Sequence, residues 1–458
     1  MCRKVIGRIV FFVCLCAAVS CTDRISFEDS PDYPEIFPDY VGVTVPEGTP
    51  NLSFRMKDGR RFRKETVRRG DTIFTTVSAW EKGSGKGVRY APFPVYVSHD
   101  SIDSHLVYRL IEPGYESWHD MGIYQRELSS FREKAVVTNR INGLGCVNCH
   151  AFPAGDAGTM LFHARGAGGG TVFISGDSVG IVNLTDLENG KQGTYPSWHP
   201  SGRYVAFSSN QTRQCFIYGD RQPVEVYDTS SDIFLYDTQT GTVNEYPALN
   251  SDSVLETFPS WSSDGTRLYY CAADSVTRLP AERGKLHYRL MEIGFSEGKF
   301  TDEPQCIFQC DTLSVSFPRN FGRYVLMTVS SFGTFPIWHR EADLALLDLV
   351  TGEFRKVDEL NSGSAESYHS WSSNGRWVVF GSRRHDNRYT RLYIAHFDGE
   401  GRFDKPFLLP QKDVSHNDLR LKSYNIPEFM NGKVSVSKSR IVKEIRKSKG
   451  TDIGIKTN

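Results

Sequence analysis

The sequence has no excess of charge of either sign, because 54 lysines and arginines balance 54 aspartates and glutamates over 458 residues. A chain with this balance offers no electrostatic basis for nucleic acid as a partner, or for an anionic membrane surface as its main partner. Methionine is scarce, at 7 residues, whereas 29 phenylalanines, 21 tyrosines and 40 glycines are present. That composition is typical of a folded, mainly β protein, and the length allows about two to four domains.

The chain also lacks two motifs of well-known enzyme classes. It has no phosphate-binding glycine loop and no metalloprotease His-Glu-x-x-His helix. These motifs hold a phosphate or a zinc ion in nucleotide-dependent enzymes and metalloproteases. Their absence favours a binding or carrier function over catalysis.

The sequence has no long apolar run, and its clearest short one lies at the N-terminus. Arg3, Lys4 and Arg8 precede an apolar stretch over residues 9–18, which is too short to span a bilayer as a mature helix. It ends in Ala-Val-Ser-Cys21, which resembles a bacterial lipoprotein box. We therefore expect residues 1–20 to be a lipoprotein signal peptide and Cys21 to carry lipid, with an ordinary signal peptide as the alternative. The predicted location is the envelope of a Gram-negative bacterium, at the outer membrane.

Five residues carry the clearest chemical signal of the chain: Cys146-Val-Asn-Cys149-His150. A Cys-x-x-Cys-His run is the attachment signature of a c-type haem. Its thiols bind the haem vinyl groups as thioethers, and the imidazole becomes an axial ligand of the iron. A disulfide redox pair, half of a zinc site and coincidence are the alternatives. A redox pair would need a thioredoxin-like setting, and a zinc site would need a second Cys/His pair nearby. The sequence shows neither, so the predicted cofactor is haem c with its iron.

A haem that transfers electrons usually has a second axial ligand, Met or His. Met160 is the first choice and His163 the second, because the loop after the motif is long enough to reach the opposite face of the haem. Met121 and His119 are the other choices. Arg165 is a possible partner of a haem propionate. If none of these residues binds the iron, the open position allows catalysis or gas binding.

Four cysteines remain once the signal peptide, the lipid site and the haem motif are set aside. An even number in an oxidising compartment allows two disulfides with three possible connectivities, or plain core thiols. These residues are Cys215, Cys271, Cys306 and Cys310.

The pattern of apolar residues divides the rest of the chain. Residues 21–35 are acidic and predict a tether, and residues 36–110 alternate in short runs typical of a small β-sandwich-like domain. Trp118, Met121, Leu128 and Phe131 then recur at helical spacing, which predicts a helix over 115–131. That helix and the following glycine-rich loops make residues 111–168 a helical and loop-rich haem segment.

An internal repeat follows and decides the predicted fold. The sequences at 195–207, 258–270 and 368–380 align on a tryptophan and a glycine, and weaker copies lie at 317–327 and 426–434. Their glycines stand at 202, 265, 322, 375 and 432. Each unit holds two hairpin signals, hence about four strands, which is the texture of a β-propeller blade. We predict a β-propeller of about six blades over residues 169–436, with the tryptophan wedged between neighbouring sheets, and a polar tail over 437–458.

The repeat resembles the Trp-Ser-Pro-Asp-Gly repeat of TolB-type, WD40-like propellers. Together with residues 111–126, 146–152 and 160–166, it is similar to a family of bacterial TolB-like lipoproteins that carry a c-type haem site ahead of the propeller. The resemblance covers nearly the whole chain. It implies the architecture and leaves the activity open.

Three functions compete at this point. The first is a membrane-anchored monohaem cytochrome that transfers electrons and docks redox or envelope proteins through its propeller. The second is a haem-dependent oxidoreductase with an open axial site; a further metal centre in the channel would need clustered histidines. The third is a TolB-like interaction scaffold without functional haem. The histidines after residue 190 are scattered through the repeat: His199, His287, His339, His369, His385, His396 and His416.

Overall fold

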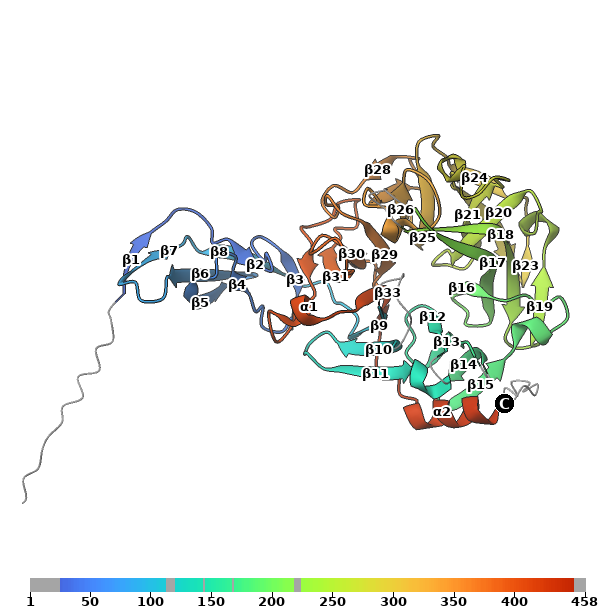
Figure 1. The fold of residues 1–458 in the computed structure, drawn as a ribbon, viewed down its shortest axis with the longest axis horizontal. Coiled ribbons are helices and arrows are strands. Elements are labelled where there is room, and N and C mark those ends of the chain that lie inside the picture. Colours follow the sequence, from blue (N-terminus) through green and yellow to red (C-terminus); the bar gives the residue numbers. More distant parts are fainter. Residues whose placement is uncertain (1–24, 113–119, 143–144, 167–168, 218–223, 449–458) are drawn as a thin grey trace, which may run out of the picture.

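The computed structural model describes residues 25–112, 120–142, 145–166, 169–217 and 224–448, and these are almost entirely β (Figure 1). A small β domain lies beside a ring of sheets, and the chain passes from one to the other near residue 100. Within the described ranges no helix is long and apolar enough to cross a membrane.

The small domain is built on one sheet with the strand order β1-β7-β6-β8-β3, in which β5 also pairs with β6. A second, two-stranded sheet is formed by β2 and β4. The pairs β1–β7 and β3–β8 are parallel, whereas the others are antiparallel. The strands are β1 (Ser26–Asp29), β2 (Ile36–Phe37), β3 (Thr44–Pro46), β4 (Arg55–Met56), β5 (Arg61–Arg69), β6 (Thr72–Trp80), β7 (Lys86–Arg89) and β8 (Phe93–Ser98). Because β1 belongs to this sheet, the predicted tether is already structured from Ser26.

Six sheets in the described part of the chain form the ring, and each is a propeller blade. The first blade contains β33 (Ser423–Met430), β9 (His105–Ile111), β10 (Gly122–Glu127) and β11 (Glu133–Thr138). The second contains β12 (Val147–Ala151), β13 (Thr159–Ala164), β14 (Gly170–Ser175) and β15 (Ser178–Val182). The third contains β16 (Thr194–Trp198), β17 (Tyr204–Phe216), β18 (Val224–Asp237) and β19 (Thr242–Glu245).

The other three blades follow in chain order. The fourth contains β20 (Val254–Trp261), β21 (Arg267–Asp274), β22 (Arg289–Ser296), β23 (Lys299–Phe300) and β24 (Gln305–Phe308). The fifth contains β25 (Ser314–Phe321), β26 (Tyr324–Ser330), β27 (Asp343–Asp348) and β28 (Phe354–Lys356). The sixth contains β29 (Glu366–Trp371), β30 (Trp377–Ser382), β31 (Arg391–His396) and β32 (Phe407–Leu408).

The ring is closed by the last strand of the chain. β33 pairs antiparallel with β9 and so becomes the innermost strand of the first blade. The contacts between inner strands run from β12 to β16, β20, β25, β29 and β33. The ring is thus closed by a strand from the opposite end of the chain.

Each repeat tryptophan ties its blade to the one before it. The indole Nε1 of Trp198 donates to the carbonyl oxygen of Ala151, at 3.2 Å. Trp261 does the same to Ser197 and Trp371 to Arg319, at 3.1 and 3.0 Å. The tryptophans thus lie between neighbouring sheets, as the repeat predicts.

The predicted helix over 115–131 is wrong for its described part. Residues 113–119 lie outside the described residues, and Gly122–Glu127 is the strand β10, paired with β9 on one side and β11 on the other. A strand inside a blade is packed on both faces, so its apolar residues need not alternate. The helical spacing of the apolar residues was therefore a coincidence.

The predicted haem segment is not a separate module. Residues 111–168 supply strands to the first two blades, and the first blade already begins at His105. The ring therefore starts well before residue 169, and the small domain ends earlier than residue 110.

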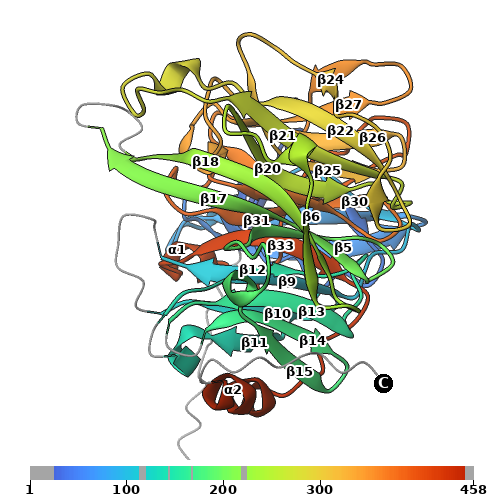
Figure 2. The same ribbon diagram turned by 90° about the vertical axis from the view of Figure 1, so that its right-hand side faces the viewer.

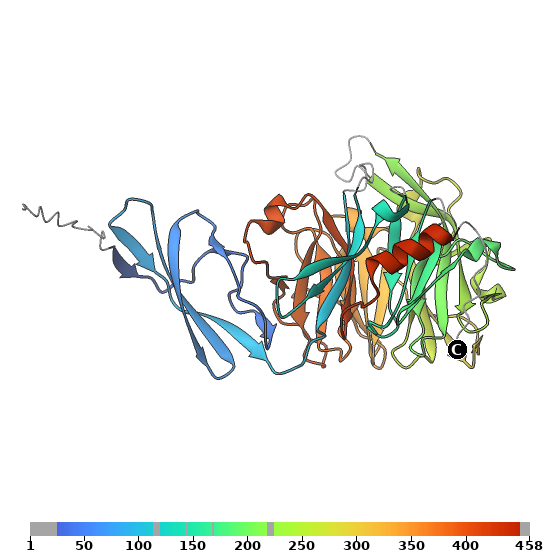
Figure 3. The same ribbon diagram turned by 90° about the horizontal axis from the view of Figure 1, so that it is seen from below.

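The predicted polar tail contains a packed helix. α2 (Lys438–Lys447) begins after Ser437, whose side chain accepts a hydrogen bond from the amide of Arg440. Ile441 and Ile445 are buried in the same core as strands of the first two blades, and α2 lies along the outside of β15 (Figure 3). One turn of helix, α1 (His416–Leu419), and five short 3-10 helices occupy connections: Asn139–Asn142, Leu184–Asp186, Pro247–Leu249, Arg283–Lys285 and Pro336–Trp338.

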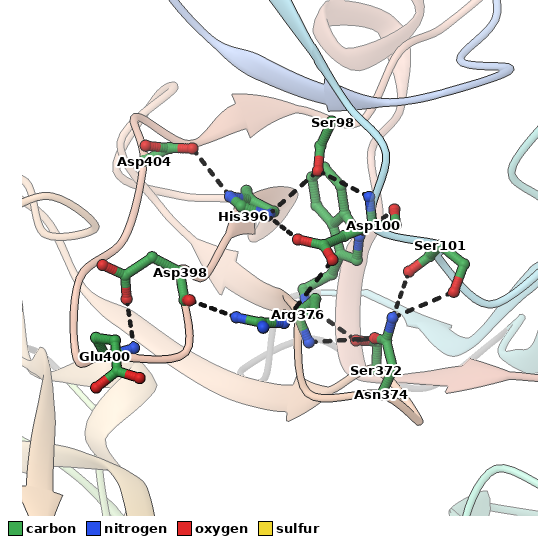
Figure 4. A network of polar contacts seen from close by, with 11 residues as sticks. Ser98, Asp100, Ser101, Ser372, Asn374, Arg376, His396, Asp398, Glu400 and Asp404 are labelled. Atoms are coloured by element: carbon green, nitrogen blue, oxygen red, sulfur yellow. Dashed lines mark hydrogen bonds and ion pairs between the residues drawn. The ribbon is translucent and has the colours of Figure 1, made fainter.

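The small domain is fixed to the sixth blade. Its core is continuous with that blade through Trp377, Ile394 and Leu409. Around this contact the His396 ring lies between two carboxylates, with Nε2 2.7 Å from Asp100 Oδ2 and Nδ1 3.0 Å from Asp404 Oδ2 (Figure 4). The two parts are thus joined by apolar packing and by a polar network.

One hairpin stands out from the ring. β17 and β18 are much longer than their neighbours and extend past them (Figure 2). Glu225, near the end of this hairpin, reaches the fifth blade, where its carboxylate lies 3.2 Å from His339 Nε2. The hairpin therefore bridges over the fourth blade.

Candidate functional site

The innermost strands of all six blades share one backbone irregularity. In each, the pairing register shifts by a bulge at the same point. The first bulge residue has a positive φ of 45–53° in every blade, a conformation that is rare for aromatic and β-branched residues. These residues are Cys149, Tyr195, Phe258, Phe317, Tyr368 and Ile426.

The haem motif therefore coincides with the repeat. Cys149-His-Ala-Phe152 stands in the second blade where Tyr195-Pro-Ser-Trp198 stands in the third. Cys149 takes the aromatic position, and His150 takes the position that is proline in four blades and His369 in the sixth. The motif is the missing copy of the repeat, because the second blade has no other.

Aromatic side chains at the bulge close the channel. The ring centroids of Tyr195 and Phe258 are 4.5 Å apart, those of Phe258 and Phe317 4.1 Å, and those of Phe317 and Tyr368 5.2 Å. Such distances are those of rings in direct contact. The four rings form a layer across the centre of the propeller, which we call the aromatic layer.

A cavity of about 300 Å³ lies on one side of the aromatic layer. Its wall includes five of the six bulge residues, all but Tyr368, together with residues that follow the bulge in each inner strand, but none that precede it. It therefore opens toward the turns that join the first and second strands of the blades. Among the residues that line it are His150, Arg319 and Glu428.

His150 is a buried imidazole without a hydrogen-bond partner. Its side chain is 1% exposed, and neither ring nitrogen has a partner among the described residues. The closest carboxylate oxygen, Glu428 Oε1, is 3.8 Å from Nε2. Burial and the charge of Arg109 lower the pKa of His150 to about 3, against a smaller opposing effect of the Ile426 backbone, so the ring is neutral at physiological pH.

His369 shows what this position does when it is satisfied. Its Nε2 donates to the carbonyl oxygen of Leu326 at 2.8 Å. Burial likewise lowers the pKa of His369 to about 3. The contrast with His150 matters because buried polar groups in proteins nearly always have partners.

Arg319 and Glu428 depart from the repeat at its third position, which is serine in three blades. Arg319 Nη1 donates to the carbonyl oxygen of Pro318 at 3.2 Å. No described carboxylate lies within ion-pair distance of Arg319, unlike Arg203 and Arg323, which pair with aspartates. Burial raises the pKa of Glu428 to about 8, although Arg319 works in the opposite direction.

No family model and no curated protein matches this chain. Solved structures do. The tricorn protease matches over 81% of this chain and 42% of its own, at 10% identity and a TM-score of 0.40. An oligogalacturonate lyase in complex with manganese matches over 68% of this chain and 74% of its own, at 13% identity and 0.38. The β-propeller domain of the Trilobed protease from Pyrococcus furiosus matches over 77% and 99%, at 11% identity and 0.36.

This chain is a β-propeller protein. The assignment rests on the six blades of this chain itself, and the likeness to those structures, at TM-scores of 0.36 to 0.40, carries no part of it. The predicted fold class is thus confirmed in its main part, a mainly β propeller. A membership in any one family of propellers is not shown.

The propeller places the haem-motif residues unevenly around the cavity. Cys149 and His150 line it, whereas Cys146 does not. Both thiols are free, and Cys146 is largely buried. The neutral imidazole and the free thiols fit a c-type haem, but only one of the two thiols shares the cavity with the imidazole. The fit is therefore incomplete.

None of the described choices for a second axial ligand lines this cavity. Met160 packs in the core between the first two blades. The His163 ring lies 5.8 Å from the Phe207 ring of the third blade, and its Nδ1 lies 3.0 Å from Thr171 Oγ1 on the neighbouring strand β14. The Met121 sulfur accepts a hydrogen bond from the amide of Val147. His119 lies outside the described residues. The structure thus brings none of the three described side chains opposite His150.

The other predicted residues have ordinary positions. The amide of Arg165 donates to the carbonyl oxygen of Cys146 at 2.8 Å, so it extends the pairing of β12 and β13. The four remaining cysteines, expected to allow two disulfides, are all free thiols: Cys215, Cys271, Cys306 and Cys310. No three His, Cys, Asp or Glu side chains in the described ranges gather as metal ligands.

A serine motif that the sequence does contain also has a structural place. Gly176-Asp-Ser178-Val-Gly180 matches the Gly-x-Ser-x-Gly pattern of hydrolase nucleophiles. Those nucleophiles stand on a sharp turn from a strand into a helix, whereas this segment is the exposed hairpin turn between β14 and β15. The segment is therefore a turn of the second blade.

Proposed function

We propose that this chain is a membrane-anchored binding protein of the cell envelope whose ligand enters the mouth of the propeller channel. The cavity above the aromatic layer carries this proposal, because polar side chains from the second, fifth and first blades line it together: His150, Arg319 and Glu428. A concave site with an apolar floor and a few convergent polar groups is the usual form of a ligand site. A rigid ring of blades is well suited to hold such a site.

The anchor in this proposal is Cys21, which lies outside the described residues. β1 begins soon after it, at the end of the small domain that is far from the ring (Figure 1). A lipid at Cys21 would therefore put the small domain between the membrane and the propeller. The small domain then acts as a spacer that presents the channel to envelope partners.

Binding of an uncharged fluorescent probe, N-phenyl-1-naphthylamine, tests the site without assuming the charge of the ligand. We expect enhanced fluorescence with one probe per chain in the wild type. Ser197→Phe, which fills the mouth from the third blade, is expected to abolish it. Ser296→Phe, on the exposed end of β22, is the matched control. Equal probe binding by Ser197→Phe and the wild type would place the probe elsewhere and refute the proposal.

A haem-bearing electron-transfer protein is the second candidate, and one observation favours it. His150 lacks a partner where its counterpart His369 has one, and the adjoining thiols are free. Cys146 and Cys149 would hold the haem as thioethers, and His150 would supply an axial nitrogen. A haem c supplies one-electron transfer, and the propeller would dock the redox partners.

A pyridine haemochrome spectrum of the chain, produced in a host with haem-maturation machinery, separates the two candidates. Covalently retained haem, lost in the Cys146→Ala, Cys149→Ala double variant, would establish the haem protein. A colourless protein in which Cys146 and Cys149 can both be alkylated would eliminate electron transfer and leave the binding function. If haem is retained, added carbon monoxide distinguishes a closed sixth position from an open one.

A further inference from the structure

Arg319 is the one residue of the inner-strand motif that introduces a permanent positive charge into the cavity. The residues at its position in the other blades are Ala151, Ser197, Ser260, Ser370 and Glu428. Arginine stays charged at any physiological pH. A permanent charge at a position that is alanine or serine in four of the other five blades needs an explanation beyond packing.

The guanidinium of Arg319 forms few hydrogen bonds with the described residues. It has five N–H donors, and a single hydrogen bond, to the carbonyl oxygen of Pro318, is formed with described residues. Elsewhere in the repeat the chain pairs its arginines: Arg203 with Asp237, and Arg323 with Asp348, both through Nε and Nη2. The acid closest in the channel, Glu428, does not come within 4 Å of Arg319.

The backbone of Arg319 is held firmly although its head group is not. Its carbonyl oxygen accepts the indole hydrogen of Trp371 at 3.0 Å. In the ladder between β25 and β26, Arg319 pairs with Leu326. The side chain is thus presented from a fixed point toward the cavity. Preorganised donors of this kind lower the cost of binding an acceptor.

The size and the aromatic floor of the cavity limit the ligand whose acceptor group Arg319 could bind. The floor is the aromatic layer, of which Tyr195, Phe258 and Phe317 line the cavity. A volume of about 300 Å³ is at the small end of ligand sites. A guanidinium binds planar carboxylates through two parallel hydrogen bonds, and one arginine matches one negative charge.

We propose that the channel mouth binds a monocarboxylate with a small apolar or aromatic group, and that Arg319 holds its carboxylate while the aromatic layer receives its apolar part. This inference rests on the proposed binding function and adds the chemistry of the ligand. The carboxylate comes either from a free organic acid or from the C-terminus of a peptide.

Calorimetric titration of the full mature chain with two pairs of probes tests the proposal. Benzoate is compared with benzamide, and a tripeptide ending in phenylalanine is compared with its amide. Each acid is expected to bind at least about tenfold more tightly than its amide, the factor expected for a charge-assisted hydrogen bond. The acid that binds more tightly identifies the source. Equal binding of acids and amides, or no binding of either acid, would overturn the proposal.

Variants locate the effect. Arg319→Met keeps the length of the side chain and is expected to weaken acid binding at least about tenfold. Arg402→Met, an exposed arginine between β31 and β32, is the control and should bind as the wild type. Glu428→Gln keeps the size and polarity of a side chain whose raised pKa leaves it largely uncharged near pH 7, and it should bind the acid about as tightly as the wild type. A loss in Glu428→Gln equal to that in Arg319→Met would show that the arginine does not hold the carboxylate.

The naphthylamine and carboxylate titrations distinguish a wrong ligand chemistry from a wrong binding site. If the uncharged naphthylamine binds in the mouth but acids and amides bind alike, the cavity is a ligand site and the carboxylate chemistry is wrong. If Arg319→Met loses its folded circular dichroism spectrum, Glu428→Gln and the acid–amide comparison still decide the question.

Discussion

Trp371 donates its indole hydrogen to the carbonyl oxygen of Arg319, 3.0 Å away. The tryptophan that locks the sixth blade to the fifth is thus also the group that fixes the backbone of the arginine in the cavity. Trp198 makes the same bond to Ala151 between the third and second blades, at 3.2 Å. The two hydrogen bonds are alike in geometry, but one acceptor residue has a guanidinium side chain and the other has a methyl group.

This difference predicts that Trp371→Phe and Trp198→Phe will separate stability from binding. Each variant loses one buried indole hydrogen bond, which costs about 1 kcal/mol or somewhat more if the carbonyl stays unpaired. Urea unfolding should show similar losses in both. Benzoate affinity, by calorimetry, should fall in Trp371→Phe and stay unchanged in Trp198→Phe. Equal affinity losses in the two variants would mean that the tryptophan does not position Arg319.

The pH dependence of stability should contain a contribution from His339. Burial by itself would lower the pKa of His339, but the carboxylates of Glu225 and Glu341 raise it to about 9 from an ordinary value of 6.5. A raised folded-state pKa stabilises the protein fully below pH 6.5, and this stabilisation is lost as the pH rises through about 9. We expect the contribution to be on the order of 3 kcal/mol.

His339→Gln removes the titrating group and keeps a hydrogen-bonding side chain. Its free energy of unfolding in urea should lie below that of the wild type at pH 6, and the gap should close toward pH 10. His99→Gln, at an exposed histidine of the small domain, should show no such gap. A wild-type-to-variant difference that does not change with pH would refute the assignment.

The polar network at the sixth blade predicts that Asp100 controls how tightly the small domain is held. Burial lowers and the carboxylates of Asp404 and Asp100 raise the pKa of His396, with a net upward shift. Asp100→Asn removes one of the two charges, while the main chain of residue 100 still accepts from Trp377. Hydrogen exchange of β8 should become faster in this variant. Asp58→Asn, which removes a surface ion pair with Arg60, should leave exchange of β8 unchanged.

The C-terminal helix should contribute to stability despite its polar composition. Ile441 is fully buried between α2 and the first two blades, and replacing a buried isoleucine by alanine costs about 2–5 kcal/mol. We expect Ile441→Ala to lower the free energy of urea unfolding by that amount. Lys443→Ala, on the exposed face of the same helix, should change it by less than about 0.5 kcal/mol. Equal, small effects would mean that α2 is not docked in solution.

The parts of the fold that could be predicted from sequence are those that local chemistry repeats. Turn glycines such as Gly202 and Gly265 have positive φ, and alternating apolar strands follow them, so each blade shows its own signal. The same holds for Trp198 and Trp261. The helix over 115–131 failed because a strand packed on both faces carries no regular period. Ile441 and Ile445 did show helical spacing, but among lysines their burial depends on the neighbouring blade.

The cavity could not be predicted from the sequence, for a different reason. Arg319 and Glu428 are 109 residues apart in the sequence, and nothing local brings them to one channel. The aligned third position of the repeat was the available signal, since it changes from serine to arginine and to glutamate. It acquires meaning when the blades close into a ring, because closure points all third positions at one axis.

The sequence by itself determined the repeat, the number of strands in each unit and the presence of a Cys-x-x-Cys-His run, because each depends on residues that are neighbours in the chain. The tertiary structure decided what surrounds them. Pairing of β12 with β13 put Cys149 and His150 into an inner-strand bulge of the second blade, and pairing of β33 with β9 closed the ring around them. Long-range strand pairing sets those neighbours, and strand pairing is a property of the folded chain.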